Sequence, residues 1–139
     1  MIERIALFGG SFNPIHLGHL IAARAIAEQL ELSRVIFLPS AWSPHKTEVP
    51  PRDAEHRAEM VRRAISGEPR FEFSDFDLNR PGPTYTIDTV THFAQEFGPN
   101  VRLDWMIGAD SFPDLAGWRR AAELLDFCTI VTAARPGAP

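Results

Sequence analysis

Short apolar runs alternate along this chain with longer stretches in which apolar and charged positions share a helical period. The short runs are typical of strands buried on both faces of a sheet, and the longer stretches are typical of helices packed on that sheet. The predicted strands are Ile5–Phe8, Val35–Leu38, Phe71–Phe73, Leu103–Ile107 and Thr129–Thr132, and the predicted helices are Leu20–Leu30, Ala54–Ile65, Thr86–Phe97 and Trp118–Leu125. Because this alternation calls for βαβ units, we predict an α/β fold with a Rossmann-like, doubly wound, mainly parallel sheet of five strands.

Length and composition narrow the class of protein further. The chain of 139 residues suits one domain, here residues 1–139, and its 45% hydrophobic and 23% charged residues argue against disorder or a membrane span. A net charge of −4 argues against binding nucleic acid through a broad basic surface. The single cysteine, Cys128, lies in an apolar run and is interpreted as a core residue. The N-terminus shows no signal-peptide pattern, so we expect a cytoplasmic protein.

The junction between the first strand and the first helix carries the densest chemistry. Residues 9–19 read Gly-Gly-Ser-Phe-Asn-Pro-Ile-His-Leu-Gly-His, and such a turn lies at the carboxyl end of a parallel strand, where ligands bind. Gly9 and Gly10 allow the backbone to turn tightly and to approach phosphate oxygens. His16 and His19 share one face of a first helical turn, and Gly18 between them keeps the approach open. We predict a nucleotide phosphate site.

Two alternatives apply to the histidines. A His-x-x-His pair on its own favours capping or surface histidines, and only the context of residues 9–19 favours phosphate binding. A metal site fits less well, because this spacing supplies at most two ligands and no further His or Cys cluster lies nearby in the sequence.

Residues 9–19 resemble the signature of the nucleotidyltransferase superfamily that carries an H-x-G-H motif. Their particular form resembles the nicotinate mononucleotide adenylyltransferase family, and four further segments agree with that family in order. The first, Leu38 to Lys46, is similar to a family loop ending in Pro-His-Lys, which implies that Lys46 approaches the phosphates. The alternative is a solvated surface lysine.

The second segment, residues 83–89, resembles the family's Ser-Tyr-Thr run, with Thr84 in place of the usual Ser. The resemblance implies that this helix start places backbone N–H groups against the nicotinate carboxylate. A capping run at a helix start is the structural alternative, and both interpretations can hold together, since a helix N-terminus is itself a carboxylate site.

The remaining segments follow the fourth and fifth predicted strands. Residues 107–111 resemble the family's Gly-Ala-Asp segment, which implies that Asp110 bonds ribose hydroxyls; a helix N-cap is the alternative. Trp118 matches the family's aromatic residue, which the resemblance implies stacks on the pyridine ring of the mononucleotide. The alternative is a tryptophan of the core. Residues 134–137 resemble the family's Arg-Pro-Gly, and the alternative for Arg135 is an exposed residue of a plain turn.

The resemblance implies adenylyl transfer from ATP to nicotinate mononucleotide, giving nicotinate adenine dinucleotide and pyrophosphate in NAD biosynthesis, with Mg²⁺ carried on the ATP. Two alternative functions remain open. One is an adenylyltransferase that prefers nicotinamide mononucleotide, and the other is a non-catalytic or weakly active nucleotide-binding module. The implied catalytic residues are His16, His19 and Lys46. The implied ATP and phosphate contacts are Gly9, Gly10, Ser11, Phe12, Gly18 and Arg135; those to the pyridine mononucleotide are Thr84, Tyr85, Thr86, Thr89 and Trp118; those to ribose are Gly108, Asp110 and Ser111.

The family's pattern continues beyond the Arg-Pro-Gly segment through a second phosphate-gripping motif that residues 1–139 do not contain. We therefore expect a C-terminally short domain that lacks half of the ATP site. Such a domain leaves apolar surface exposed, and a homo-oligomer is one way to cover it.

Overall fold

A computed structural model of the chain describes residues 2–10, 12, 15–40, 54–79, 85–108 and 120–133. Their elements are β1 (Glu3–Gly10), α1 (Leu17–Gln29), β2 (Arg34–Pro39), α2 (Ala54–Ile65), β3 (Phe71–Phe73), α3 (Thr86–Phe97), β4 (Val101–Gly108), α4 (Ala121–Leu124) and β5 (Thr129–Ala133). The five strands form one sheet in the order β3-β2-β1-β4-β5. All four strand pairings are parallel. The α/β prediction is confirmed, and the sheet is wholly rather than mainly parallel.

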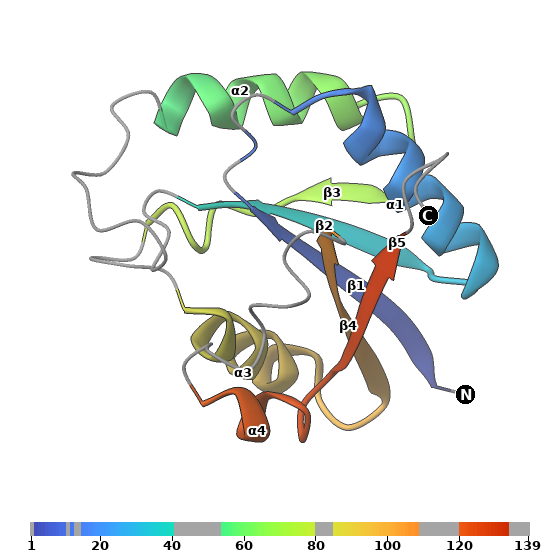
Figure 1. Cartoon of the computed structure of the whole chain (residues 1–139), viewed down its shortest axis with the longest axis vertical. Coiled ribbons are helices and arrows are strands. Elements are labelled where there is room, and N and C mark those ends of the chain that lie inside the picture. The colour runs from blue at the N-terminus through green and yellow to red at the C-terminus, as the bar shows by residue number, and fades with distance from the viewer. Residues whose placement is uncertain are drawn as a thin grey trace.

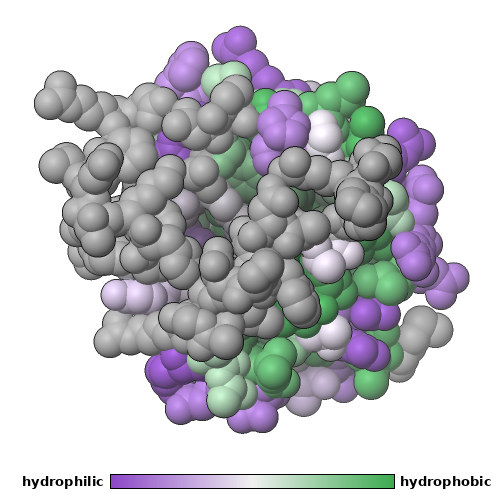
Figure 2. Space-filling view, viewed as in Figure 1, coloured by the Kyte–Doolittle hydropathy of each residue, from purple (hydrophilic) through white to green (hydrophobic). Residues whose placement is uncertain are grey.

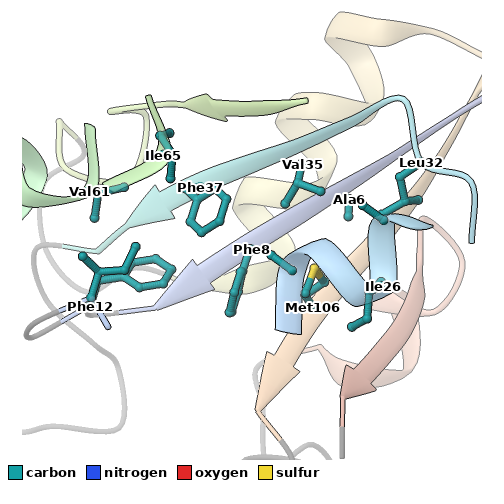
Figure 3. Close-up of a cluster of buried hydrophobic side chains, with 13 residues drawn as sticks. Ala6, Phe8, Phe12, Ile26, Leu32, Val35, Phe37, Val61, Ile65 and Met106 are labelled. Atoms are coloured by element: carbon teal, nitrogen blue, oxygen red, sulfur yellow. The ribbon is translucent and has the colours of Figure 1, made fainter. Parts of the chain in front are cut away.

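The sheet is the middle layer of three, with α1 and α2 on one face and α3 and α4 on the other (Figure 1). Alternate residues of β1 serve the two faces, as a strand's period of two requires. Ala6 and Phe8 belong to the buried cluster under α1 and α2, shown in Figure 3, whereas Ile5 and Leu7 belong to the cluster under α3 and α4. Both faces of the sheet are therefore core, which explains the nearly continuous apolar runs in the sequence.

Two predicted helices differ from the observed ones in their bounds. Helix α1 begins at Leu17 rather than Leu20, because His16 caps the helix and its first turn includes Gly18. Helix α4 covers Ala121–Leu124 and ends one residue before the predicted Leu125, whereas Trp118 and Arg119 of the predicted helix lie outside the described residues. The predicted bounds of α2, β3 and α3 are confirmed.

Several large apolar side chains are exposed. They are Ile2, Leu17, Ile21, Leu125 and Phe127. In Figure 2, hydrophobic surface is visible among the described residues on the side where Figure 1 places α1 and β5. None of the described helices is long and apolar enough to cross a membrane.

Candidate functional site

Phe12, which lies between β1 and α1, packs its ring against the sheet. Phe12 is 3% exposed and its ring meets those of Phe8 and Phe37 at centroid distances of 5.3 and 5.9 Å. Its φ of 45° lies in the left-handed region that non-glycine residues seldom adopt. A strained residue held by core contacts is common at ligand sites.

His16 and His19 meet at the N-terminus of α1. Their rings stack with centroids 3.8 Å apart and planes 27° apart. Each Nδ1 accepts a backbone N–H: His16 Nδ1 from Gly18 at 3.1 Å, and His19 Nδ1 from His16 at 3.0 Å. The pair therefore forms a reciprocal cap on the helix. The capping interpretation of these histidines and the phosphate interpretation are compatible, since capping engages only one nitrogen of each ring.

Gly18 has a specific steric reason to be glycine. A Cβ at this position would lie 2.9 Å from Cε1 and 3.0 Å from Nδ1 of the His16 ring. The ring can fold over the first turn of the helix only because this Cβ is missing. In the structure, the group that occupies the space left by the missing Cβ of Gly18 is the His16 imidazole.

His19 lies in a more apolar environment than His16. It is half-buried, whereas His16 is exposed, and the edges of its ring face Phe8 and Phe12 at centroid distances of 6.0 and 5.1 Å. Burial, followed by the nearby His16 ring, lowers the pKa of His19 from its ordinary 6.5. His19 is therefore held in its neutral form at physiological pH.

Gly9 and Gly10 lie at the carboxyl end of β1. Packing on the face of the sheet that α3 covers requires glycine at position 9. A Cβ on Gly9 would stand 2.5 Å from Cη2 and 2.7 Å from Cζ2 of Trp105 on β4, whereas one on Gly10 would meet only the Phe12 ring, at 3.9 Å. Trp105 is 5% exposed. Gly9 therefore admits the indole beneath the end of β1, in addition to its proposed place beside a phosphate.

The N-terminus of α3 is the second predicted contact region. Tyr85 is its N-cap, with an extended backbone and no side-chain cap hydrogen bond. The Asp88 and Thr89 N–H groups donate to the Tyr85 carbonyl at 3.1 and 3.3 Å, so those of Thr86 and Ile87 precede the first intrahelical bonds.

Thr89 is fully buried, and its hydroxyl donates to Asp77 Oδ1 at 2.6 Å. Asp77 is itself 1% exposed. In this arrangement Thr89 anchors the start of α3 to the segment after β3. A role of Thr89 toward a ligand would act through the helix that it holds.

Gly108 ends β4 and pairs with Ala133 of β5 in register. It therefore lies at the same carboxyl edge of the sheet as Gly10. The other predicted site residues lie outside the described residues: Ser11, Lys46, Thr84, Asp110, Ser111, Trp118 and Arg135.

Three buried residues near this edge carried no sequence signal that we used: Trp105, Asp77 and Arg57. Arg57 on α2 is 1% exposed, and its Nη1 donates to the Ser40 carbonyl at 2.9 Å. The Ser40 N–H in turn donates to the Gly10 carbonyl at 2.9 Å. This chain of bonds ties α2 and the end of β2 to the end of β1. A charged residue on the apolar face of a helix is the one pattern that could have singled out Arg57.

A cavity of about 580 Å³ lies elsewhere, between α3 and the β2–β3 side of the sheet. Its wall includes the Arg34–Glu72 ion pair and the Phe76 ring, which stacks on His92 at 3.9 Å. None of its lining residues belongs to the predicted site.

Comparison with known proteins identifies the class. Residues 7–138 match the family model described as cytidylyltransferase-like. A probable nicotinate-nucleotide adenylyltransferase from Thermus thermophilus is 47% identical over 136 residues, which are 98% of this chain and 72% of the relative. A relative with the same description from Moorella thermoacetica is 42% identical over 134 residues, but this chain spans only 62% of it.

The fold agrees with a solved structure as well. Nicotinic acid mononucleotide adenylyltransferase from Plasmodium falciparum, complexed with NaAD, superposes with a TM-score of 0.71 at 17% identity, over 99% of this chain and 77% of the other. The parallel sheet and the histidine-bearing turn thus belong to a cytidylyltransferase-like nucleotidyltransferase. Within that class, the chain belongs to the nicotinate-nucleotide adenylyltransferase family of NAD biosynthesis.

Proposed function

We propose that this chain transfers the adenylyl group of ATP to nicotinate mononucleotide, with the stacked His16–His19 pair as the centre of the phosphate site. The observation that carries the proposal is the placement of this pair. Both rings lie at the N-terminus of α1, at the carboxyl end of the central strand β1. A helix N-terminus with two imidazoles suits an anion that gains negative charge during reaction.

The proposed reaction needs no general base. The attacking group is the phosphate of the mononucleotide, which is already mostly dianionic near pH 7. Its oxygen forms a bond to the α-phosphorus of ATP, the bond from that phosphorus to the bridging oxygen breaks, and the electron pair leaves with pyrophosphate. The protein therefore has to align two polyanions and to stabilise charge on the leaving group.

The phosphate contacts are assigned to the β1–α1 turn. We assign them to Gly9, Gly10, Ser11, Phe12, Gly18, His16 and His19, with Lys46 and Arg135 as the cations. Mg²⁺ enters on the ATP phosphates as part of the substrate, bound chiefly by phosphate oxygens and water. Within the described ranges, no group of three or more metal-ligating side chains gathers.

The pyridine mononucleotide is assigned to the start of α3. Thr84, Tyr85, Thr86 and Trp118 are the proposed contacts, with Thr89 as the anchor of the helix. The Thr86 and Ile87 N–H groups support this assignment, since a carboxylate is stabilised at a helix N-terminus. Gly108, Asp110 and Ser111 are assigned to ribose, because Gly108 ends β4 beside β1 at the carboxyl edge of the sheet.

The test is a pyrophosphate-release assay with ATP and either nicotinate or nicotinamide mononucleotide. We expect release with the nicotinate substrate and a turnover lower by about 10²-fold in the His19→Ala variant, because a donor to the transition state is lost. His56→Ala, an exposed histidine on α2, is the control and should retain parental turnover. Near-parental turnover of His19→Ala at saturating ATP would contradict the role of His19.

Two other outcomes of this assay decide between functions. Faster release with nicotinamide mononucleotide would reassign the substrate to the amide. Nucleotide binding without release, even at high protein concentration, would instead favour a non-catalytic nucleotide-binding module.

A further inference from the structure

We propose that Arg57 is a positioning residue for the handling of ATP: its buried guanidinium holds the end of β2, and through it the end of β1, in one arrangement. The consequence for ATP rests on the proposed function, whereas the hydrogen bonds that hold the two strand ends belong to the free protein. Arg57 takes no part in the adenylyl transfer described above.

Arg57 occupies a position on α2 where the helix otherwise buries apolar side chains. The other buried residues of the helix are Ala58, Val61 and Ile65, and the last two pack in the cluster shown in Figure 3. Arg57 is 1% exposed, and it is the only buried arginine among the described residues. Burial of a guanidinium costs free energy that an apolar side chain at the same position would not cost. Stability alone therefore does not explain this arginine.

Two hydrogen bonds lead from Arg57 to the end of β1. Arg57 Nη1 donates to the Ser40 carbonyl at 2.9 Å, and the Ser40 N–H donates to the Gly10 carbonyl at 2.9 Å. Gly10 and Pro39 are partners in the parallel pairing of β1 with β2, so Ser40 extends that pairing one residue beyond the end of β2. We call this pair of bonds the Arg57–Ser40–Gly10 link. It joins a helix to two neighbouring strand ends at the carboxyl edge of the sheet, where ligands bind.

The link lies on the side of the molecule that we assign to ATP. Helix α2 covers the same face of the sheet as α1 (Figure 1), and the link ends at Gly10, next to the turn proposed to hold the phosphates. The start of α3, proposed to hold the pyridine mononucleotide, lies on the opposite face. A change at Arg57 should therefore alter the handling of ATP and spare the other substrate, whereas a general loss of folding would affect both.

The first arm of the test observes Arg57 in the parental chain without any substrate. The ¹H–¹⁵N spectra of arginine-labelled protein report the rotation of each guanidinium. We expect slow rotation and separate Nη signals for Arg57, because Nη1 is held by the Ser40 carbonyl. The exposed Arg63 on the same helix should give averaged signals. Fast rotation of the Arg57 guanidinium would overturn the proposal, whatever the activity of the chain.

The second arm uses substitutions on α2 that separate positioning from folding. Arg57→Met fills the apolar face without a donor, so kcat/KM for ATP should fall about tenfold, while KM for nicotinate mononucleotide stays within about twofold of the parent. Arg57→Lys keeps a donor for the Ser40 carbonyl and should remain within about threefold of the parent for both substrates. Arg63→Met is the matched control, because Arg63 is exposed on the same helix, and it should retain parental kinetics.

The Ser40 amide connects the kinetics with the structure. Its hydrogen exchange should become about tenfold faster in Arg57→Met, because the residue after β2 is released from α2. The Ser74 amide is the reference, since its N–H donates to the Phe37 carbonyl at 3.0 Å and does not depend on the link. Its exchange should stay unchanged.

Each result of the second arm bears on the role of Arg57. Equal losses for the two substrates in Arg57→Met, or unchanged exchange of the Ser40 amide, would overturn it. If Arg57→Met does not fold, the comparison passes to Arg57→Lys: a loss confined to ATP would support the role, and equal losses for both substrates or parental kinetics together with fast rotation of the parental guanidinium would overturn it. A chain that releases no pyrophosphate in any form, yet shows the slow guanidinium and the faster Ser40 amide, would contradict the proposed function and leave the Arg57–Ser40–Gly10 link established.

Discussion

The starts of helices α1 and α3 lie on opposite faces of one sheet and are built in opposite ways. Helix α1 is capped by its own side chains, since His16 and His19 accept the backbone N–H groups of the junction. Helix α3 has no side-chain cap hydrogen bond at Tyr85 and is anchored below its first turn by the buried Thr89–Asp77 bond.

The difference shows what each helix start offers a ligand. At α1 the His16 and Gly18 N–H groups donate to imidazole Nδ1 atoms, so the Nε2 atoms are the ring nitrogens left for a ligand. At α3 the Thr86 and Ile87 N–H groups, which precede the first intrahelical hydrogen bonds, are the proposed donors. A phosphate chain that gains charge in the transition state suits the first arrangement, and a carboxylate whose charge stays constant suits the second.

The largest effect is expected where the α3 start is joined to the core. Thr89→Val removes the hydroxyl that donates to buried Asp77 while keeping the side-chain shape, and should lower the free energy of unfolding by about 2 kcal/mol. Thr91→Val is the control on the same helix, because its hydroxyl bonds back to the Ile87 and Asp88 carbonyls of its own turn. Urea unfolding measures both.

The two threonine variants should differ clearly. A change within about 0.5 kcal/mol for Thr91→Val, against about 2 kcal/mol for Thr89→Val, would place the anchor of α3 at Asp77. Equal losses for the two variants would remove the contrast between a core-anchored and a self-capped helix.

A smaller effect, on binding alone, is expected from Thr86→Pro. Thr86 is the first residue of α3, where proline is well tolerated, and Tyr85 before it already has the extended backbone that proline requires (φ −103°, ψ 133°). The variant loses one N–H, so KM for nicotinate mononucleotide should rise about tenfold, with KM for ATP unchanged. Steady-state kinetics with each substrate varied in turn provides the measurement.

Thr86→Ala retains the N–H and should keep the parental KM. Nicotinamide mononucleotide has no carboxylate, so the proline variant should narrow the preference between the two mononucleotides. An unchanged preference would place the carboxylate somewhere other than the start of α3.

The elements of the fold could be predicted because each has a local signal. Buried strands and amphipathic helices impose periods on the sequence, and the bounds of α2, β3 and α3 follow from those periods alone. The start of α1 was predicted three residues late. Its cap is a histidine rather than the usual Ser, Thr, Asp or Asn, and Gly18 in its first turn lowers the local helix propensity.

The site could be predicted only in part, because some of its groups are defined by tertiary contacts. The shared face of His16 and His19 could be predicted from their spacing at a helix start, whereas the stacking of their rings is seen only in the structure. By contrast, the fit of Trp105 beneath Gly9 depends on the pairing of β1 with β4. The Asp77–Thr89 bond joins residues twelve apart through a packed helix. No local pattern encodes such contacts.

The smallest effect is expected from mild acid, and it should touch one helix start only. The pKa of His19 is lowered in the folded chain, chiefly by burial and then by His16, so the folded state binds fewer protons than the unfolded state as pH falls. The stability that the neutral form of His19 provides is complete above the ordinary pKa of 6.5 and is lost as pH falls through the lower pKa of the folded state.

Amide hydrogen exchange between about pH 7.5 and pH 5.5, corrected for the intrinsic rate, measures this effect. Protection should fall in the first turns of α1, while the protection of α3 stays unchanged. His19→Asn should abolish the difference, because the asparagine keeps an acceptor and does not titrate. Loss of protection in α3 over the same pH range would contradict this prediction. The two helix starts would then differ only in the ligands that they are proposed to bind.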